Sequence, residues 1–189
     1  MLHHLRGDHP VKGTVGEGEA AAVTGGDAGA IVQARQPVDL GLTRRLRSRA
    51  KALGVSAASL CHVAWSLLLA RTSGRKDVVF GTLLSGRMHG GEGVDRVVGM
   101  FMNTLPVRMR VGAQTVEESV RETHALLTDL LSHEHAPLVL AQSCSGVRPP
   151  APLFTALLNY RHTVSGRAIA RKPRSGWEGI QALGGVERT

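Results

Sequence analysis

The stretch AASLCHVAWSLLLARTSGRKDVVFGTLLSGR, residues 57–87, decides the fold of this chain. Its first part is apolar at nearly every position, which predicts a helix that is buried over most of its surface. A β-branched, apolar run bounded by Asp77 and Gly86 follows, and such a run is typical of a strand. We expect the helix to pack on the strand 78–84 through four apolar side chains, namely Leu60, Val63, Leu67 and Leu68.

The predicted helix contains two side chains that could carry chemistry, His62 and Cys61. We interpret His62 as a hydrogen-bonded residue of the core or its boundary, because the spacing places no second ligand beside it. A ligand role is the alternative. Cys61 is interpreted as a small core residue. Cys61 and Cys144 form neither a Cys-x-x-Cys pair nor a metal-binding pattern.

Another helix is predicted just upstream, because apolar residues recur on one helical face at Leu42, Leu46, Ala50 and Leu53. Gly54 ends this helix, and Ser56 can cap the next one. The helix carries the basic run RRLRSRAK (44–51). We interpret the run as a solvated face. The alternative is a patch for an acidic partner, such as a carrier domain that bears a phosphate-linked arm.

Downstream, residues 99–111 predict a second strand, which Pro106 places at an edge or beside a bulge. Thr115 and Glu118 form a capping box that opens a helix over 116–131. Three further elements are predicted: a turn and short helix over 133–142, a strand over 153–161 and a weak strand over 179–189. This order of elements indicates an α/β fold in which helices pack on a mixed sheet.

The composition limits the classes of function. The chain has 189 residues, 42% of them hydrophobic, so one domain with an aliphatic core is expected. Aromatic residues make up only 3%, which argues against stacking single-stranded nucleic acid. The net charge of +8 is spread along the chain. We find no apolar signal region and no run of about 18 apolar residues, so a cytoplasmic location without a membrane span is expected.

The segment 11–34 is rich in glycine and keeps neither the helical nor the strand period. We interpret it as a flexible linker that buries too little apolar surface to become ordered. The expected organisation is therefore residues 1–10, a linker over 11–36, and a folded unit over 37–189.

Four stretches, in this order, resemble the condensation domain of nonribosomal peptide synthetases: FGTLLSGR (80–87), VVGMFMNTLPVR (97–108), HEHAPL (133–138) and LFTALLNYR (153–161). The second is the most specific, since it is similar to the family's Gly-x-Phe-x-Asn-Thr-x-Pro-x-Arg element. The resemblance covers about residues 37–163. It implies a chloramphenicol acetyltransferase-like lobe and an activity that joins carrier-bound acyl groups by an amide bond.

The opening residues HHLRGD (3–8) resemble the family's catalytic signature, His-His-x-x-x-Asp-Gly, with His9 where glycine is usual. Alone, this cluster fits chance, a tag or a weak metal site. Upstream of the four elements, the resemblance makes His3, His4 and Asp8 the catalytic candidates. In the family a whole N-terminal lobe precedes the signature. We therefore expect a truncated domain, mainly a C-terminal lobe, that is inactive alone.

The resemblance also implies roles for single residues. His4 would accept a proton from the attacking amine or hold it by a hydrogen bond. Asp8 would pair with Arg87 and fix the loop. Ser85, Asn103 and Asn159 resemble residues near the substrate channel.

Simpler interpretations stand beside these roles. We favour Asn103 as a residue that bonds the backbone, and Asn159 as a polar group at a strand end. Gly81, Gly86 and Gly99 are interpreted as residues that satisfy backbone geometry, not as a phosphate cradle. No metal site is expected.

The resemblance implies partners in place of a bound cofactor. Substrates would be carried on the phosphopantetheine of carrier domains, and a separate N-terminal lobe or other synthetase modules could complete the enzyme. Nucleic acid and membrane are not expected partners. The alternative function is a non-catalytic interaction module that keeps a carrier-docking or lobe-pairing surface.

Overall fold

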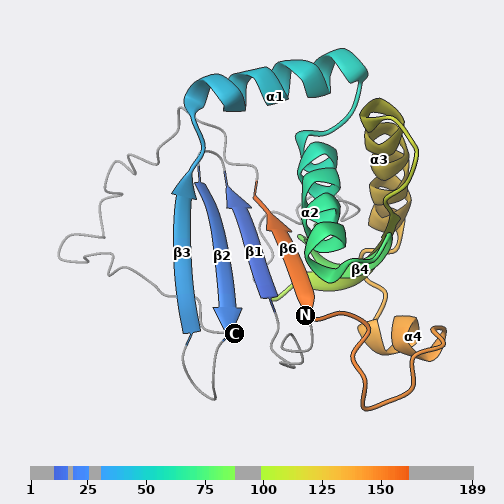
Figure 1. The fold of residues 1–189 in the computed structure, drawn as a ribbon. Coiled ribbons are helices and arrows are strands. Elements are labelled where there is room, and N and C mark those ends of the chain that lie inside the picture. The colour runs from blue at the N-terminus through green and yellow to red at the C-terminus, as the bar shows by residue number, and fades with distance from the viewer. Residues whose placement is uncertain (1–10, 17–18, 26–30, 88–98, 162–189) are drawn as a thin grey trace, which may run out of the picture.

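A six-stranded mixed sheet organises this protein, as a computed structural model shows for residues 11–16, 19–25, 31–87 and 99–161 (Figure 1). The strands are β1 (Val11–Gly16), β2 (Glu19–Gly25), β3 (Ile31–Pro37), β4 (Asp77–Leu84), β5 (Asn103–Arg110) and β6 (Ala156–Tyr160). The helices are α1 (Leu40–Leu53), α2 (Ala57–Ser73), α3 (Val116–Ser132) and α4 (Leu138–Ser143). The expected α/β class, with helices packed on a mixed sheet, is confirmed.

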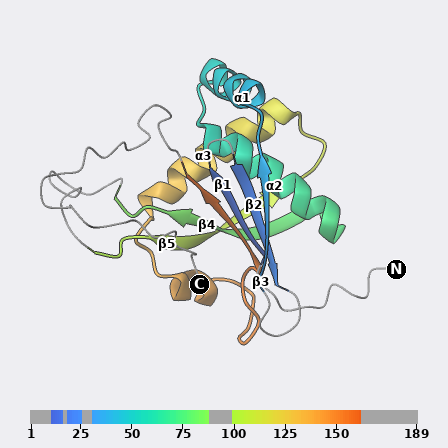
Figure 2. The ribbon, with the colours of Figure 1, turned by 90° about the vertical axis from the view of Figure 1, so that its left-hand side faces the viewer.

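The strand order is β3-β2-β1-β6-β4-β5. Strands β1 and β4 both run parallel to β6, whereas the pairs β1–β2, β2–β3 and β4–β5 are antiparallel. The last strand along the described chain, β6, therefore lies in the middle of the sheet. Helices α2 and α3 lie on one side of β4 and β5, and α4 lies on the other (Figure 2).

The expectation that residues 11–34 lack regular structure is wrong for the three stretches that form β1, β2 and β3. Their pairing is made by backbone groups, so side chains with little periodicity do not prevent it. Strand β3 also crosses the expected boundary between residues 36 and 37. The division of the chain into three parts stays a prediction. The expected strand over 179–189 lies outside the described residues.

The hydrophobic core lies between α2, α3 and the strands β4, β5 and β6. Alternate side chains of each strand point into it, as the pleat of a strand requires. Phe80 and Leu158 are both 0% exposed. The buried cluster consists of Val63, Val78, Phe80, Val107, Met109, Val120, Leu127, Ala156 and Leu158.

Helix α2 does not bury the face that the sequence indicated. Val63 is buried and Leu60 packs against the core, but Leu67 and Leu68 are 39% and 50% exposed. The expectation that these two leucines are core residues is wrong. The buried residues of α2 follow a helical stripe that is mostly polar: Ser59, His62, Val63 and Ser66. Because α2 is apolar nearly all round, hydrophobicity alone could not select this stripe.

His62 is a hydrogen-bonded core residue, as expected. Its ring is 3% exposed, with Nδ1 2.7 Å from the Ala58 carbonyl oxygen and Nε2 2.9 Å from Thr82 Oγ1. A carbonyl can only accept, so Nδ1 carries the proton and the Thr82 hydroxyl donates to Nε2. Burial lowers the pKa of His62 because it disfavours the charged imidazolium. The residue ties α2 to β4 in its neutral form.

The helix ends follow the predicted capping residues. The Asp39 side chain accepts a hydrogen bond from the Leu42 N–H at the start of α1, and α1 ends at Gly54 with φ of 68°. At α3, the Thr115 N–H donates to Glu118 Oε2 (2.8 Å), and the Glu118 N–H donates to Thr115 Oγ1 (3.2 Å). This capping box was predicted from the sequence and is confirmed.

Among the described helices, none alone is long and apolar enough to cross a membrane. Helices α1 and α2 meet such a test only as a pair, and they are bent by 109° at the break between them.

Replacing Leu158 with alanine should lower the free energy of unfolding by roughly 2–5 kcal/mol, because a fully buried leucine leaves a cavity. The same replacement at Leu67, which is 39% exposed, should cost less than half as much. Chemical denaturation of both variants measures the difference. Equal shifts of the two unfolding midpoints would contradict the assignment of the core.

The pH dependence of stability should reveal the buried His62. Its pKa is lowered from 6.5 in the folded state, so the unfolded chain takes up the proton first as pH falls. Stability is then unaffected by this group above about pH 6.5 and decreases below it, by at most about 1.4 kcal/mol per pH unit. His62→Gln removes the titrating group. The stability of this variant, measured by denaturation from pH 7.5 to 5, should fall less steeply than that of the parent, and parallel curves would refute the assignment.

Candidate functional site

The candidate site begins at the turn Ser85–Arg87, which follows β4. Gly86 has a φ of +66°, and a Cβ there would lie 1.9 Å from the Phe101 carbonyl oxygen. Any other residue would therefore clash with the backbone before β5. The interpretation of Gly86 as a residue that satisfies backbone geometry is confirmed. The close contact joins the stretches 80–87 and 97–108 at one point.

Arg87 lies across the same junction. Its guanidinium carbon is 4.5 Å from the centre of the Phe101 ring, within the range of a cation–π contact. This contact was not predicted, although Phe101 is one of only three phenylalanines in the chain. The predicted partner of Arg87, Asp8, lies outside the described residues, as do His3 and His4. That pairing and the catalytic roles therefore stay predictions.

Asn103 connects the start of β5 to the stretch 133–138. Its Nδ2 donates to the carbonyl oxygens of Glu134 (2.9 Å) and Ala136 (2.7 Å), and its Oδ1 accepts from the Thr104 N–H (2.9 Å). All three bonds are made to the backbone, so the favoured interpretation of Asn103 is confirmed. A contribution of Asn103 to a channel stays a prediction.

The loop that Asn103 holds contains a buried carboxylate. Glu134 is 1% exposed, and its Oε1 lies 3.8 Å from Nε2 of the exposed His135. On the other side, Nδ1 of His133 lies 3.1 Å from the Asp129 carbonyl oxygen. In the part of the chain that the structure describes, no three His, Cys, Asp or Glu side chains are grouped to hold a metal ion.

The sheet register brings four predicted site residues to one end of the sheet. Leu84 pairs with Asn103, and Thr82 pairs with Leu158, the residue before Asn159. Ser85 and Arg87 directly follow β4. Residues that are far apart in the sequence thus meet where the parallel strands β4 and β6 end, the edge at which open α/β sheets bind ligands. Ser85 is exposed, whereas Asn159 is 7% exposed.

Comparison with known families matches a model described as Condensation domain to residues 30–174, which is most of the chain. This chain belongs to the condensation domain family. The family's most specific element, over 97–108, contributes Phe101, Asn103 and β5 to the site. Both the resemblance found in the sequence and the expected fold are therefore confirmed.

Relatives of known name are large synthetases. The chain is 52% identical over 164 residues to malpinin synthetase of Mortierella alpina, a match that covers 87% of this chain and 2% of that protein. It is 33% identical over 127 residues to a linear gramicidin synthase of Brevibacillus parabrevis, covering 67% of this chain and 2% of the synthase. The chain thus spans a very small part of the synthetases that it matches.

Solved structures of condensation domains share the fold. The condensation domain of monacolin K polyketide synthase superposes with a TM-score of 0.55 at 25% identity, over 64% of this chain and 29% of that one. A four-domain nonribosomal peptide synthetase superposes with a TM-score of 0.58 at 20% identity, over 68% of this chain and 10% of that one. This chain therefore corresponds to part of a condensation domain.

Replacing Asn103 with aspartate should loosen the loop 133–138. Aspartate keeps an acceptor for the Thr104 N–H but loses both donors, and its charge would face two carbonyl oxygens. Leaving these groups unsatisfied should cost roughly 1–3 kcal/mol of stability. Hydrogen exchange should rise in residues 134–140 and stay unchanged in α2. Unaltered exchange in that loop would show that Asn103 does not hold it.

Proposed function

We propose that this chain is the C-terminal-lobe part of a condensation domain that joins two carrier-bound acyl groups by an amide bond. The observation that carries the proposal is the meeting of Ser85, Arg87, Asn103 and Asn159 at one end of the sheet. Three of the four stretches that resemble the family supply these residues. The fourth, 133–138, is hydrogen-bonded to Asn103.

In the proposed reaction, the acceptor amine attacks the carbonyl carbon of the donor thioester. A C–N bond forms, the C–S bond breaks, and the ammonium proton is finally carried by the departing phosphopantetheine thiol. His4 would hold the amine or relay this proton, and His3 would lie beside it. A large part of the rate gain would come from alignment of the two reactants, which can supply roughly 7–11 kcal/mol.

Arg87 has the proposed task of positioning the catalytic loop through Asp8. The described geometry supports a fixed Arg87, because the Phe101 ring supports its guanidinium and Gly86 sets the turn. The strand that follows the His-His-x-x-x-Asp stretch, β1, starts at Val11 opposite Ala156, at the other end of the sheet from Asn159. The tether through β1 therefore does not by itself bring the loop to Arg87.

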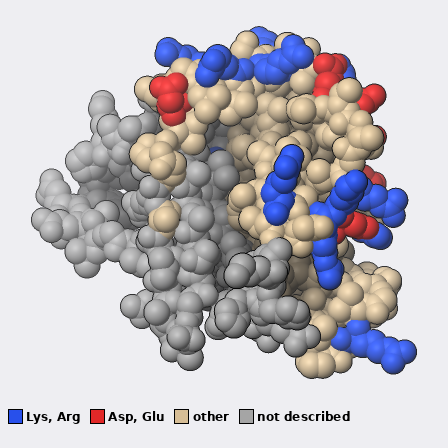
Figure 3. All heavy atoms as spheres, in the orientation of Figure 1, with Lys and Arg blue, Asp and Glu red and all other residues tan. Residues whose placement is uncertain are grey.

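The proposed partners are carrier domains, which would bring the substrates on phosphopantetheine arms. The proposed location is the cytoplasm, where such a multidomain assembly would operate. Charge supports an acidic partner, because Lys and Arg side chains lie along α1 at one edge of the molecule (Figure 3). In this run Arg44, Arg45 and Lys51 are exposed, and Arg49 forms an exposed ion pair with Glu117 (3.4 Å).

A second candidate function is a non-catalytic module that docks carrier domains or another lobe. The small share of a condensation domain that the chain covers favours it, together with the exposed basic face of α1. The two functions differ in one outcome. Both predict carrier binding, but only the enzyme part forms an amide when the missing lobe is supplied.

The purified chain should form no amide product from two loaded carrier domains, because its His4 lacks the lobe that would hold it within about half an ångström of its productive position. Adding a separate N-terminal lobe, cut before its own His-His motif, should restore product that disappears in His4→Ala. Mass spectrometry detects the product. Product formed by the chain alone and dependent on His4 would overturn the fragment proposal. Carrier binding without product in the mixture would favour the non-catalytic module.

A further inference from the structure

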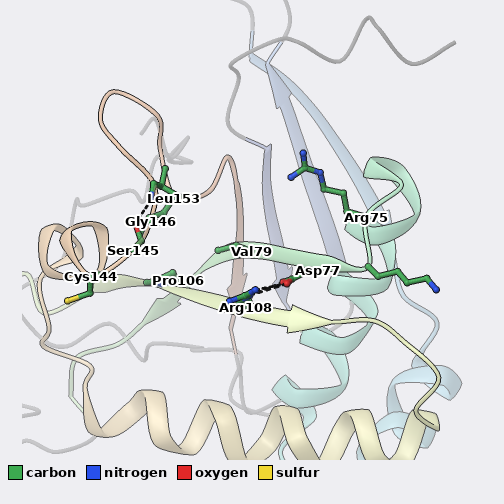
Figure 4. A pocket seen from close by; sticks show the side chains of 12 residues that line it. Arg75, Asp77, Val79, Pro106, Arg108, Cys144, Ser145, Gly146 and Leu153 are labelled. Carbon is green, nitrogen blue, oxygen red and sulfur yellow. Dashed lines mark hydrogen bonds and ion pairs between the residues drawn. The ribbon is translucent and has the colours of Figure 1, made fainter.

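An open hollow of about 860 Å³ lies at the end of β4 away from the candidate site (Figure 4). It is formed between the face of β4 and β5 that turns away from α2 and the chain around α4. Strand β4 has eight residues, so at about 3.3 Å per residue the hollow and the Ser85–Arg87 turn are separated by roughly 20 Å. The hollow is thus distinct from the site described above.

The floor of the hollow is apolar. Val79 and Pro106 belong to the set of alternate strand residues that face away from the core, and both line the hollow. Val147 and Leu153 line it from the chain that follows α4. A space of this volume, lined by aliphatic groups, is in the range of small-molecule sites.

The wall opposite the sheet is held by its own hydrogen bonds. Gln142 Nε2 donates to the carbonyl oxygens of Val147 (3.0 Å) and Ala151 (3.2 Å). The Ser145 hydroxyl donates to the Gln142 carbonyl oxygen (2.7 Å) and accepts from the Val147 N–H (3.2 Å). Phe154 fixes the same segment to the sheet, since its ring fills the space where a Cβ of Gly81 would lie, 2.5 Å away. The wall is therefore formed before any ligand arrives.

Cations gather at one end of the hollow. Arg75, Lys76 and Arg108 line it, against Asp77 as the acidic lining residue. Arg108 already holds Asp77 through two nitrogens, at 2.9 Å from Nε and 2.7 Å from Nη2, and this lowers the pKa of the Asp77 carboxyl. The positive charge of Arg75 and Lys76 is therefore left over at this end. The opposite end carries Cys144, Ser145 and Gly146 (Figure 4).

We propose that this hollow binds a small anion with an aliphatic body. The anionic head would lie at Arg75 and Lys76, and the body would cover Val79, Pro106 and Val147. Charge complementarity selects the head, because a cationic or neutral head gains nothing from one arginine and one lysine side chain. The apolar floor selects the body, because covering it removes aliphatic surface from water.

Cys144 gives a local readout of occupancy. Its thiol is exposed and lines the hollow, whereas the other cysteine, Cys61, is half-buried in α2 and has a pKa raised by burial. A bound ligand should therefore slow alkylation of Cys144 by iodoacetamide and leave Cys61 unaffected. Mass spectrometry of the two cysteine peptides measures both rates in one sample.

The probes are decanoate, decyl phosphate, decanol and decyltrimethylammonium, each below its micelle concentration. Decanoate and decyl phosphate should slow alkylation of Cys144 at least about fivefold at saturation, and decanol and the cation should not. A difference between the two anions identifies the preferred head group. Failure of both anions to protect Cys144, or equal protection by decanol, would overturn the proposal.

Arg75→Ala/Lys76→Ala should raise the half-protecting decanoate concentration at least about tenfold, the effect of losing one charged hydrogen bond. Arg44→Ala/Arg45→Ala removes the same charge from exposed positions on α1 and should leave it unchanged. Val147→Asp, which places a carboxylate in a wall residue that is 37% exposed, should abolish protection with both cations present. Equal behaviour of the two double variants would refute the site. Because no condensation is measured, the outcome is independent of the proposed activity.

Discussion

The arrangement of this molecule depends on β4 being covered on both faces. One face, through Val78, Phe80 and Thr82, receives α2 and the core. On the other face, Gly81 leaves room for the ring of Phe154, which holds the segment before β6. Substitution of a larger residue on either face would displace a whole neighbouring element. The turn at Gly86 and the junction with Phe101 inherit their positions from this strand, because they follow it directly.

The parts of the fold that depend on local chemistry could be predicted from the sequence. The caps at Ser56 and Thr115 bind backbone groups three residues away, so their partners are visible in the sequence itself. The strands 77–84, 103–110 and 156–160 were indicated by β-branched and apolar runs. The parts that failed depend on distant partners. Strands β1, β2 and β3 form in a glycine-rich segment because the pairing edge of β6 is available, and local composition contains no trace of that edge.

The candidate site shows the same division. The sequence indicated Ser85, Arg87, Asn103 and Asn159 by their resemblance to family motifs, and the sheet register explains why the four belong together. The sequence did not indicate the cation–π partner Phe101 or the two carbonyl groups that Asn103 binds. These contacts join segments about 14 to 33 residues apart. Helix α2 is a further case, since its buried stripe is set by the hydrogen bonds of Ser59, His62 and Ser66 and not by hydrophobicity.

The central position of β6 has a consequence for how the protein is made. Strands β1 to β3 and the pair β4–β5 form two separate groups, and β6 is the strand that joins them. On the ribosome, the two groups can form only as isolated pieces until residues 156–160 have left the exit tunnel. Pairing β6 with β1 then closes a loop of about 140 residues, a late and non-local step of the kind that slows folding. During synthesis, the edges of β1 and β4 are thus exposed to other chains for most of the time that the polypeptide is being made.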